Sequence, residues 1–254
     1  MVCKTCENSL RSDFSYCPSC GGKVIRNRLT LKNVWQDLKF QVFDLDNTLF
    51  KTIKHLFTKP EVVVESFITG ARKKYMNPIS FFAIAITLSG LLFFVLRDVY
   101  HINLAENSFS QENTPNMDFI FDYQALLSYL LIPIYALMTW LLFLDNRKLN
   151  YTEHLITNAY TTGQASFVQV VLGLTIFSIF DFRYDIFNWC FLVLSITYQF
   201  YVLKKIHKIG IGSAVIRALG YFFLLVIVMM GIGILIVLIG LLSGAMSLED
   251  FRPK

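Results

Sequence analysis

Charged residues are scarce in this 254-residue chain, in which Asp, Glu, Lys and Arg make up only 16%. Hydrophobic residues make up 55%, Phe alone occupies 24 positions, and the mean hydropathy is +0.52. This composition excludes an ordinary soluble domain and is typical of a protein embedded in a bilayer. The first residues also lack the charged stub and apolar core of a signal peptide, so we expect the N-terminal segment to stay where it is made.

Five long apolar segments account for the hydrophobic excess. They lie at 79–96, 123–144, 160–180, 186–203 and 218–246. Each is close to or above the roughly 17–25 residues that a membrane helix requires. The sequence therefore predicts an all-α integral membrane protein with about five transmembrane helices, forming a bundle over residues 79–246 with a short tail at 247–254.

The connections between these segments alternate in charge. Those expected at one end of the bundle hold 19 Lys and Arg against 9 Asp and Glu, and those at the other end hold 4 against 9. The basic set is 1–78, 145–155 and 204–217, and the acidic set is 97–122, 181–185 and 247–254. The positive-inside rule places the N-terminus in the cytoplasm and the C-terminus outside, which predicts a multi-pass protein of the cytoplasmic (inner) membrane. Nucleic acid is not needed to explain the basic residues.

Four of the five cysteines form two Cys-x2-Cys pairs, Cys3 with Cys6 and Cys17 with Cys20. This spacing suits a tetrahedral Zn²⁺ site, and it predicts a small cytoplasmic zinc ribbon at residues 1–24. A reducing compartment disfavours disulfides, and four thiolates leave no open position for catalysis, so the zinc is expected to be structural. The fifth cysteine, Cys190, is expected to be a buried small apolar residue.

Residues 25–78 are expected to form a basic linker with two amphipathic helices. In the first, Lys51 and Lys54 lie opposite an apolar stripe. Thr58-x-x-Glu61 predicts a capping box at the start of the second, and Asn77-Pro78 predicts the start of the first membrane helix. Further basic residues follow the second helix: Arg72, Lys73 and Lys74. Such helices either lie on the anionic cytoplasmic leaflet or pack on the ends of the bundle, and we expect some of both.

The sequence FQVFDLDNTLF at Phe40–Phe50 resembles the first motif of the haloacid-dehalogenase phosphatases. That resemblance would make Asp44 a nucleophile, Asp46 a general acid and Mg²⁺ a cofactor. Too few soluble residues follow before the first crossing to build the required α/β core. We therefore expect the motif to be catalytically idle and the protein not to be an enzyme.

Polar side chains recur along one face of the third apolar segment: Glu153, His154, Thr157, Tyr160 and Gln164. Polar groups at membrane depth are costly unless they face a partner or a water-filled cavity, so this polar stripe is the candidate functional surface of the bundle. The alternative is that Glu153 and His154 sit at the interface, satisfied by Arg147 or Lys148. No paired carboxylates, nucleophile elbow or second metal motif accompany the stripe, which argues against hydrolysis.

Three glycines of the last segment, Gly233, Gly240 and Gly244, fall on one helix face. Small residues at this spacing allow two helices to approach closely. Packing within the bundle and pairing of two copies of the chain remain alternatives.

Several of these features together resemble a known family. They are the cysteine pairs, the residues at Thr52–Pro60, the pattern F-I-x-G-x-R-x2-Y-x-N-P-x-S-F at Phe67–Phe81, and Tyr151-x-Glu153-His154-Leu155. The chain is similar to an uncharacterised bacterial family of multi-pass membrane proteins with an N-terminal zinc ribbon, domain of unknown function 3667. The resemblance implies the topology and brings no activity.

We expect a non-enzymatic membrane scaffold or adaptor whose zinc ribbon docks a cytoplasmic partner, because small closed zinc modules most often present surfaces. A transporter or channel for a small solute or lipid, using the polar stripe, is the main alternative. A membrane-embedded enzyme acting on lipid is a weaker one.

The cysteine spacing generates a direct prediction about metal content. Elemental analysis of the purified protein should give about one zinc per chain, and the double variant Cys17→Ser/Cys20→Ser should lose it because two of four ligands are gone. The variant Cys190→Ser should keep the metal. Full zinc retention in the double variant would overturn the assignment.

Overall fold

The structure is a computed structural model, and it divides the chain into two units, Met1–Asn47 and Thr48–Lys254. The residues it describes are 2, 8–14, 17–19, 48–69, 74–102, 124–180 and 183–242. Within these residues the only β-type pairing is an isolated bridge between Val2 and Ser9, and the regular elements are helices. The all-α class is therefore confirmed for the described part of the chain.

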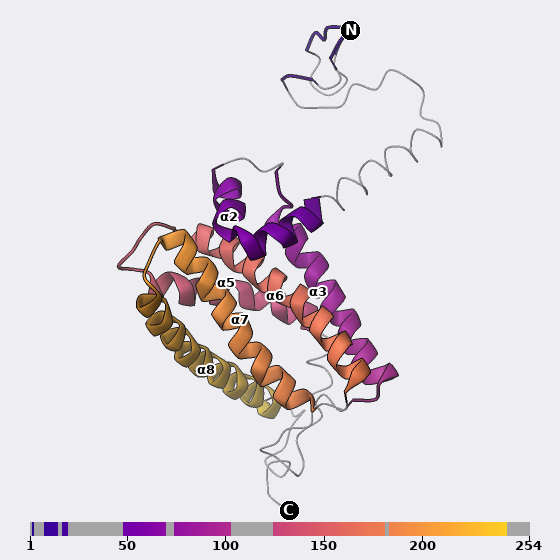
Figure 1. The fold of residues 1–254 in the computed structure, drawn as a ribbon, viewed down its shortest axis with the longest axis vertical. Coiled ribbons are helices and arrows are strands. Elements are labelled where there is room, and N and C mark those ends of the chain that lie inside the picture. The colour runs from indigo at the N-terminus through magenta and orange to yellow at the C-terminus, as the bar shows by residue number, and fades with distance from the viewer. Residues whose placement is uncertain are drawn as a thin grey trace, which may run out of the picture. The chain divides into compact units, whose positions relative to one another are not determined.

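The second unit is a helical bundle with short helices over one of its ends (Figure 1). Residues 48–58 are helical. They are followed by α2 (Pro60–Ile68), α3 (Pro78–Phe94) with a π-helical end η1 (Val95–Val99), α5 (Gln124–Leu142), α6 (Tyr151–Ile179), α7 (Tyr184–His207) and α8 (Ile211–Leu242). We call residues 48–58 and α2 the docking helices, and the end of the bundle where α6 begins and α7 ends the docking end.

Four helices of the described part are long and apolar enough to cross a membrane: Pro78–Val99, Tyr151–Ile179, Tyr184–His207 and Ile211–Leu235. They correspond to four of the five expected segments and support the membrane class. The apolar part of α5, Tyr129–Leu142, is shorter. At 1.5 Å per residue it spans roughly 20 Å, against a hydrocarbon core of roughly 30 Å. A fifth crossing therefore stays a prediction.

The helices extend beyond the expected apolar segments at the docking end. α6 begins at Tyr151 rather than 160, α7 ends at His207 rather than 203, and α8 begins at Ile211 rather than 218. Hydrophobicity marks only the apolar part of a helix, whereas its ends are set by backbone capping. At the end of α7, Lys208 adopts a left-handed conformation with φ 55°, which turns the chain into α8.

The two predicted helix starts in the linker have opposite outcomes. At α3 the prediction is confirmed, because the Asn77 side chain accepts a hydrogen bond from the Ile79 amide and Pro78 occupies the first turn. At α2 the predicted capping box is wrong: Lys59 is the N-cap and makes no side-chain cap. The Thr58 hydroxyl instead donates to the Lys54 carbonyl, 3.1 Å away, so it belongs to the preceding helix.

Helices α3 and α6 run parallel and approach closely at two glycines. A Cβ at Gly163 would lie 3.0 Å from the Phe81 ring, and one at Gly173 would lie 3.0 Å from Leu92. At Gly233 in α8, by contrast, no described atom lies within 4 Å of such a Cβ. Within the described part of the chain no close approach is made at Gly233, while the surroundings of Gly240 and Gly244 lie outside what the structure describes. The close helix approach that the structure does describe at two glycines is between α3 and α6.

Helices α7 and α8 pack against α5 through a cluster that includes Met138, Phe200, Leu203 and Tyr221. Their outer faces remain exposed and apolar. Cys190 lies on such a face of α7 and is exposed, so its expected burial is wrong. A small apolar side chain on a membrane helix is equally stable against lipid tails, and burial in protein does not follow from its hydrophobicity.

The α3–α6 contact predicts that Gly163→Val is destabilising. Overpacking against Phe81 and the neighbouring backbone of Phe82 should lower the free energy of unfolding by about 1–3 kcal/mol. Gly233→Val is the matched control and should change it little, since its Cβ meets open space. Denaturation of both purified variants in detergent measures the difference, and equal losses would contradict this account of the packing.

Candidate functional site

The polar stripe of α6 divides into three environments in the structure. Glu153 and Thr157 belong to the helix start, His154 to a buried polar network, and Tyr160 and Gln164 to the contact with the docking helices. The stripe is therefore not one continuous surface.

At the start of α6, Glu153 and Asn150 cap each other. The Glu153 amide donates to Asn150 Oδ1 at 2.9 Å, and the Asn150 amide donates to Glu153 Oε2 at 2.8 Å. The Thr157 hydroxyl donates to the Glu153 carbonyl at 2.8 Å. Such reciprocal capping satisfies two amides that the helix leaves unpaired. Lys148, expected as a partner of Glu153, pairs with Glu65 of α2 at 2.9 Å.

Farther along α6, two side chains hold the docking helices and their connection to α3. The Tyr160 hydroxyl donates to the Met76 carbonyl at 2.6 Å, and Gln164 Nε2 donates to the Ile53 carbonyl at 3.2 Å. Both side chains are fully buried. A buried hydrogen bond to a backbone carbonyl fixes the position of a whole segment rather than of one side chain.

Tyr198 of α7 makes the third contact of this kind, to the Leu56 carbonyl at 3.0 Å. In a continuous helix that carbonyl would accept from the amide four residues later, but that residue is Pro60, which has no N–H. Tyr198 therefore bonds a carbonyl that the sequence leaves without a helical donor. We call the hydrogen bonds of Tyr160, Gln164 and Tyr198 the docking contacts.

Apolar packing supports the docking contacts. The docking helices share a buried cluster with the bundle, made of Leu56, Val63, Val64, Tyr75, Met76, Phe81, Leu149, Tyr160, Val202 and Ile206. Lys148 adds a bridge, since it bonds both Glu65 and the Ile206 carbonyl at the end of α7. Of the two alternatives left open by the sequence, packing on the bundle is present.

The basic residues expected at the membrane surface lie on the outside of this assembly where the structure describes them. Lys51, Lys54 and Lys74 are exposed, while Arg72 and Lys73 lie outside the described residues. Phe50 and Phe57 are also exposed, to 69% and 50%, on the same helix as Lys51 and Lys54. Exposed aromatics beside lysines are typical of a helix in contact with a lipid surface, so the expected membrane contact stays a prediction.

A titratable pair ties residues 74–76 to the first docking helix. His55 Nδ1 and the Tyr75 hydroxyl lie 2.7 Å apart. Burial, followed by the nearby charges of Lys51 and Lys59, lowers the pKa of His55. The docked state thus favours the neutral imidazole, and its stability should decline as the pH falls below the usual range of histidine.

His154 belongs to a buried network that joins three helices. Its Nδ1 lies 3.2 Å from the Thr139 hydroxyl of α5, which also accepts from Asn158 at 2.9 Å. Gln199 of α7 donates to Asn158 Oδ1 at 2.7 Å. The His154 ring stacks near His207 with 5.6 Å between centroids. The sequence did not indicate Thr139, Gln199 or His207, because they lie on α5 and α7, outside the α6 segment in which the polar spacing was recognised.

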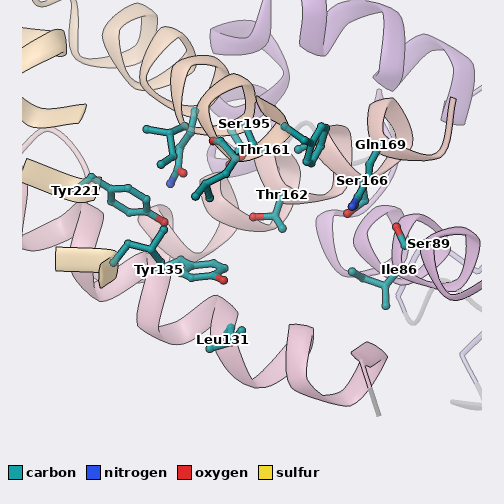
Figure 2. A pocket seen from close by; sticks show the side chains of 16 residues that line it. Ile86, Ser89, Leu131, Tyr135, Thr161, Thr162, Ser166, Gln169, Ser195 and Tyr221 are labelled. Atoms are coloured by element: carbon teal, nitrogen blue, oxygen red, sulfur yellow. The ribbon is translucent and has the colours of Figure 1, made fainter. Parts of the chain in front are cut away.

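A cavity of about 210 Å³ lies beside this network, between α3, α5, α6, α7 and α8. It is lined by a different face of α6 from the predicted stripe, with Thr161, Thr162, Ser166 and Gln169. Figure 2 shows Ser89, Ser166 and Gln169 gathered at one end of the cavity and the rings of Tyr135 and Tyr221 at the other.

The predicted zinc ligands lie mostly outside the described residues. Cys17 is described and buried, next to Leu10 and Phe14. Cys3, Cys6 and Cys20 are not described, and neither are Asp44 and Asp46. In the part of the chain that is described, no group of three or more His, Cys, Asp or Glu could hold a metal. The zinc site and the idle phosphatase-like motif therefore stay predictions.

One family model, described as a protein of unknown function (DUF3667), matches residues 46–90. No curated protein and no solved structure matches the chain. The match supports the resemblance to an uncharacterised domain family. It covers the docking helices and the first part of α3, and it does not extend to the cysteine pairs or to α6.

The matched segment contains residues that the resemblance singled out, and the structure gives them roles in docking. The Thr52 hydroxyl accepts from the Met76 amide at 3.0 Å, which joins the first docking helix to the residues before α3. Phe67 packs edge-on against Tyr160, and Phe81 lies over Gly163. These residues of the matched segment therefore connect the docking helices to α3 and α6.

The docking contacts predict that Tyr160→Phe loosens the docking helices. Leaving the Met76 carbonyl unbonded should cost about 1–3 kcal/mol, so amide hydrogen exchange in residues 48–68 should accelerate by roughly fivefold or more. Tyr201→Phe, on the exposed side of α7, is the matched control and should leave exchange unchanged. Unaltered exchange in Tyr160→Phe would show that packing alone holds these helices.

Proposed function

We propose that the protein is a non-enzymatic membrane adaptor, in which the bundle anchors a helical platform and the N-terminal zinc ribbon docks a cytoplasmic partner protein. The docking contacts carry this proposal. They fix to the bundle the helix that directly follows the N-terminal unit, so a partner bound to that unit would be held at the membrane. An adaptor needs such an anchored connection.

The structural roles of the residues in the polar stripe also support an adaptor. Glu153 caps a helix, and Tyr160 and Gln164 bond backbone carbonyls. Side chains that already make hydrogen bonds to the backbone are poorly suited to bind a solute during transport, because binding would break a hydrogen bond that stabilises the fold.

The proposal includes the predicted orientation, with the docking end at the cytoplasmic face of the inner membrane and Lys51, Lys54 and Lys74 near its anionic leaflet. The zinc ion is structural and takes no part in chemistry. Nucleic acid is not a required partner, and pairing of two copies through α8 is compatible with its exposed outer face.

A second candidate function, transport of a small solute, is favoured by one observation. The cavity between α3, α5, α6, α7 and α8 is lined partly by hydroxyl and amide side chains and lies within the part of the bundle expected in the membrane. Polar cavities at membrane depth occur in transporters as well as in receptors.

Site-specific photocrosslinking in intact cells tests the adaptor. A photoreactive residue at Ser19, which is exposed, should capture one discrete cytoplasmic protein, and the product should disappear in the double variant Cys17→Ser/Cys20→Ser. The same residue at Leu238, on the exposed face of α8, is the control and should not capture that protein. Capture of no protein at Ser19, or undiminished capture in the double variant, would contradict the proposal.

A further inference from the structure

We propose that the cavity between α3, α5, α6, α7 and α8 is a binding site for a small uncharged polyol of about six to ten non-hydrogen atoms. This site is independent of the docking contacts and of the adaptor function. It is built from side chains of five helices, and the predicted stripe does not line it.

The lining of the cavity is rich in uncharged hydrogen-bonding groups. The polar residues are Ser89, Tyr135, Thr161, Thr162, Ser166, Gln169, Ser195, Gln199 and Tyr221. None is a carboxylate, an amine, a guanidinium or an imidazole. An ion or zwitterion placed there would lose its hydration without gaining a counter-charge, which is costly in a low-dielectric interior. Hydroxyl groups both donate and accept, so a polyol suits this lining.

One lining side chain is left without a partner. Ser89 is 1% exposed, and its hydroxyl has no hydrogen-bond partner among the described residues. A buried polar atom without a partner costs about 1–3 kcal/mol, and it is an expected feature of a site whose ligand is absent. In Figure 2 Ser89, Ser166 and Gln169 are drawn at the same end of the cavity, so this end offers a ligand several hydrogen-bonding groups.

A second, smaller cavity adjoins the site without being part of it. It has a volume of about 100 Å³ and shares Ala165, Phe191 and Ser195 with the first. Gln164 lines it, and its Oε1 is buried without a partner in the described part of the chain. Two adjoining cavities thus each present an unsatisfied polar atom, with Ser195 between them.

The volume limits the size of the ligand. An apolar cavity of about 150 Å³ holds benzene, which has six non-hydrogen atoms. A cavity of 210 Å³ therefore accommodates about eight, the size of erythritol, by the same proportion. Disaccharides are too large for it, and a phospholipid headgroup is disfavoured by its charge, because the lining offers no counter-charge.

Protection of an introduced thiol tests the site in the full-length, zinc-loaded protein in lipid nanodiscs. In a Cys190→Ser background, Ser195→Cys should react with the small neutral reagent methyl methanethiosulfonate, and mass spectrometry of the peptide containing position 195 measures the rate. Saturating erythritol should slow this reaction at least fivefold, whereas sucrose at equal osmolality should not.

Two further variants separate binding from simple accessibility. Thr197→Cys lies on the exposed face of the same helix, so its reaction should be insensitive to erythritol. Adding Gln169→Leu to Ser195→Cys should keep the reaction but abolish protection. A reactive Ser195→Cys that erythritol does not protect would mean that the cavity holds only water and would overturn the proposal, as would a thiol that does not react at all while the protein melts like the wild type.

Discussion

The fold depends on satisfying polar groups where water is scarce. The first turns of α6 carry polar side chains into the bundle, and each such group needs a protein partner if bulk water is absent. The bond from Tyr160 to the Met76 carbonyl is the clearest case, because it satisfies a buried hydroxyl and at the same time fixes the chain before α3. Gln164 and Tyr198 repeat the arrangement on the first docking helix.

This constraint links the docking helices to the packing of the membrane helices. Phe81, at the start of α3, contacts both Tyr160 and the Gly163 backbone, so the position of α3 against α6 and the geometry of the docking contacts depend on each other. The cavity lies on the neighbouring face of α6, opposite Ser89 on α3, whose hydroxyl has no partner among the described residues. Helix α6 therefore contributes both to the docking contacts and to the lining of the cavity.

Much of the fold could be predicted from local sequence, whereas the site could not. Hydrophobic length identified the helices, and Asn77-Pro78 identified the start of α3 because cap and proline act within one turn. The capping box predicted from Thr58-x-x-Glu61 does not form, because the Thr58 hydroxyl is already bonded within the preceding helix. A capping box forms instead at the start of α6, between Asn150 and Glu153. The cavity is lined by side chains from five helices, and residue spacing along the chain does not predict which of these side chains meet.

The docking contacts should hold the docking helices rigidly on the bundle in a bilayer. Pulsed electron spin resonance between labels on unnatural amino acids at Lys54 and Thr197, two exposed positions on the first docking helix and on α7, tests it in lipid nanodiscs. We expect a single narrow distance distribution that broadens when Tyr160→Phe and Gln164→Leu are combined. A broad or multiple distribution in the unaltered protein would contradict it.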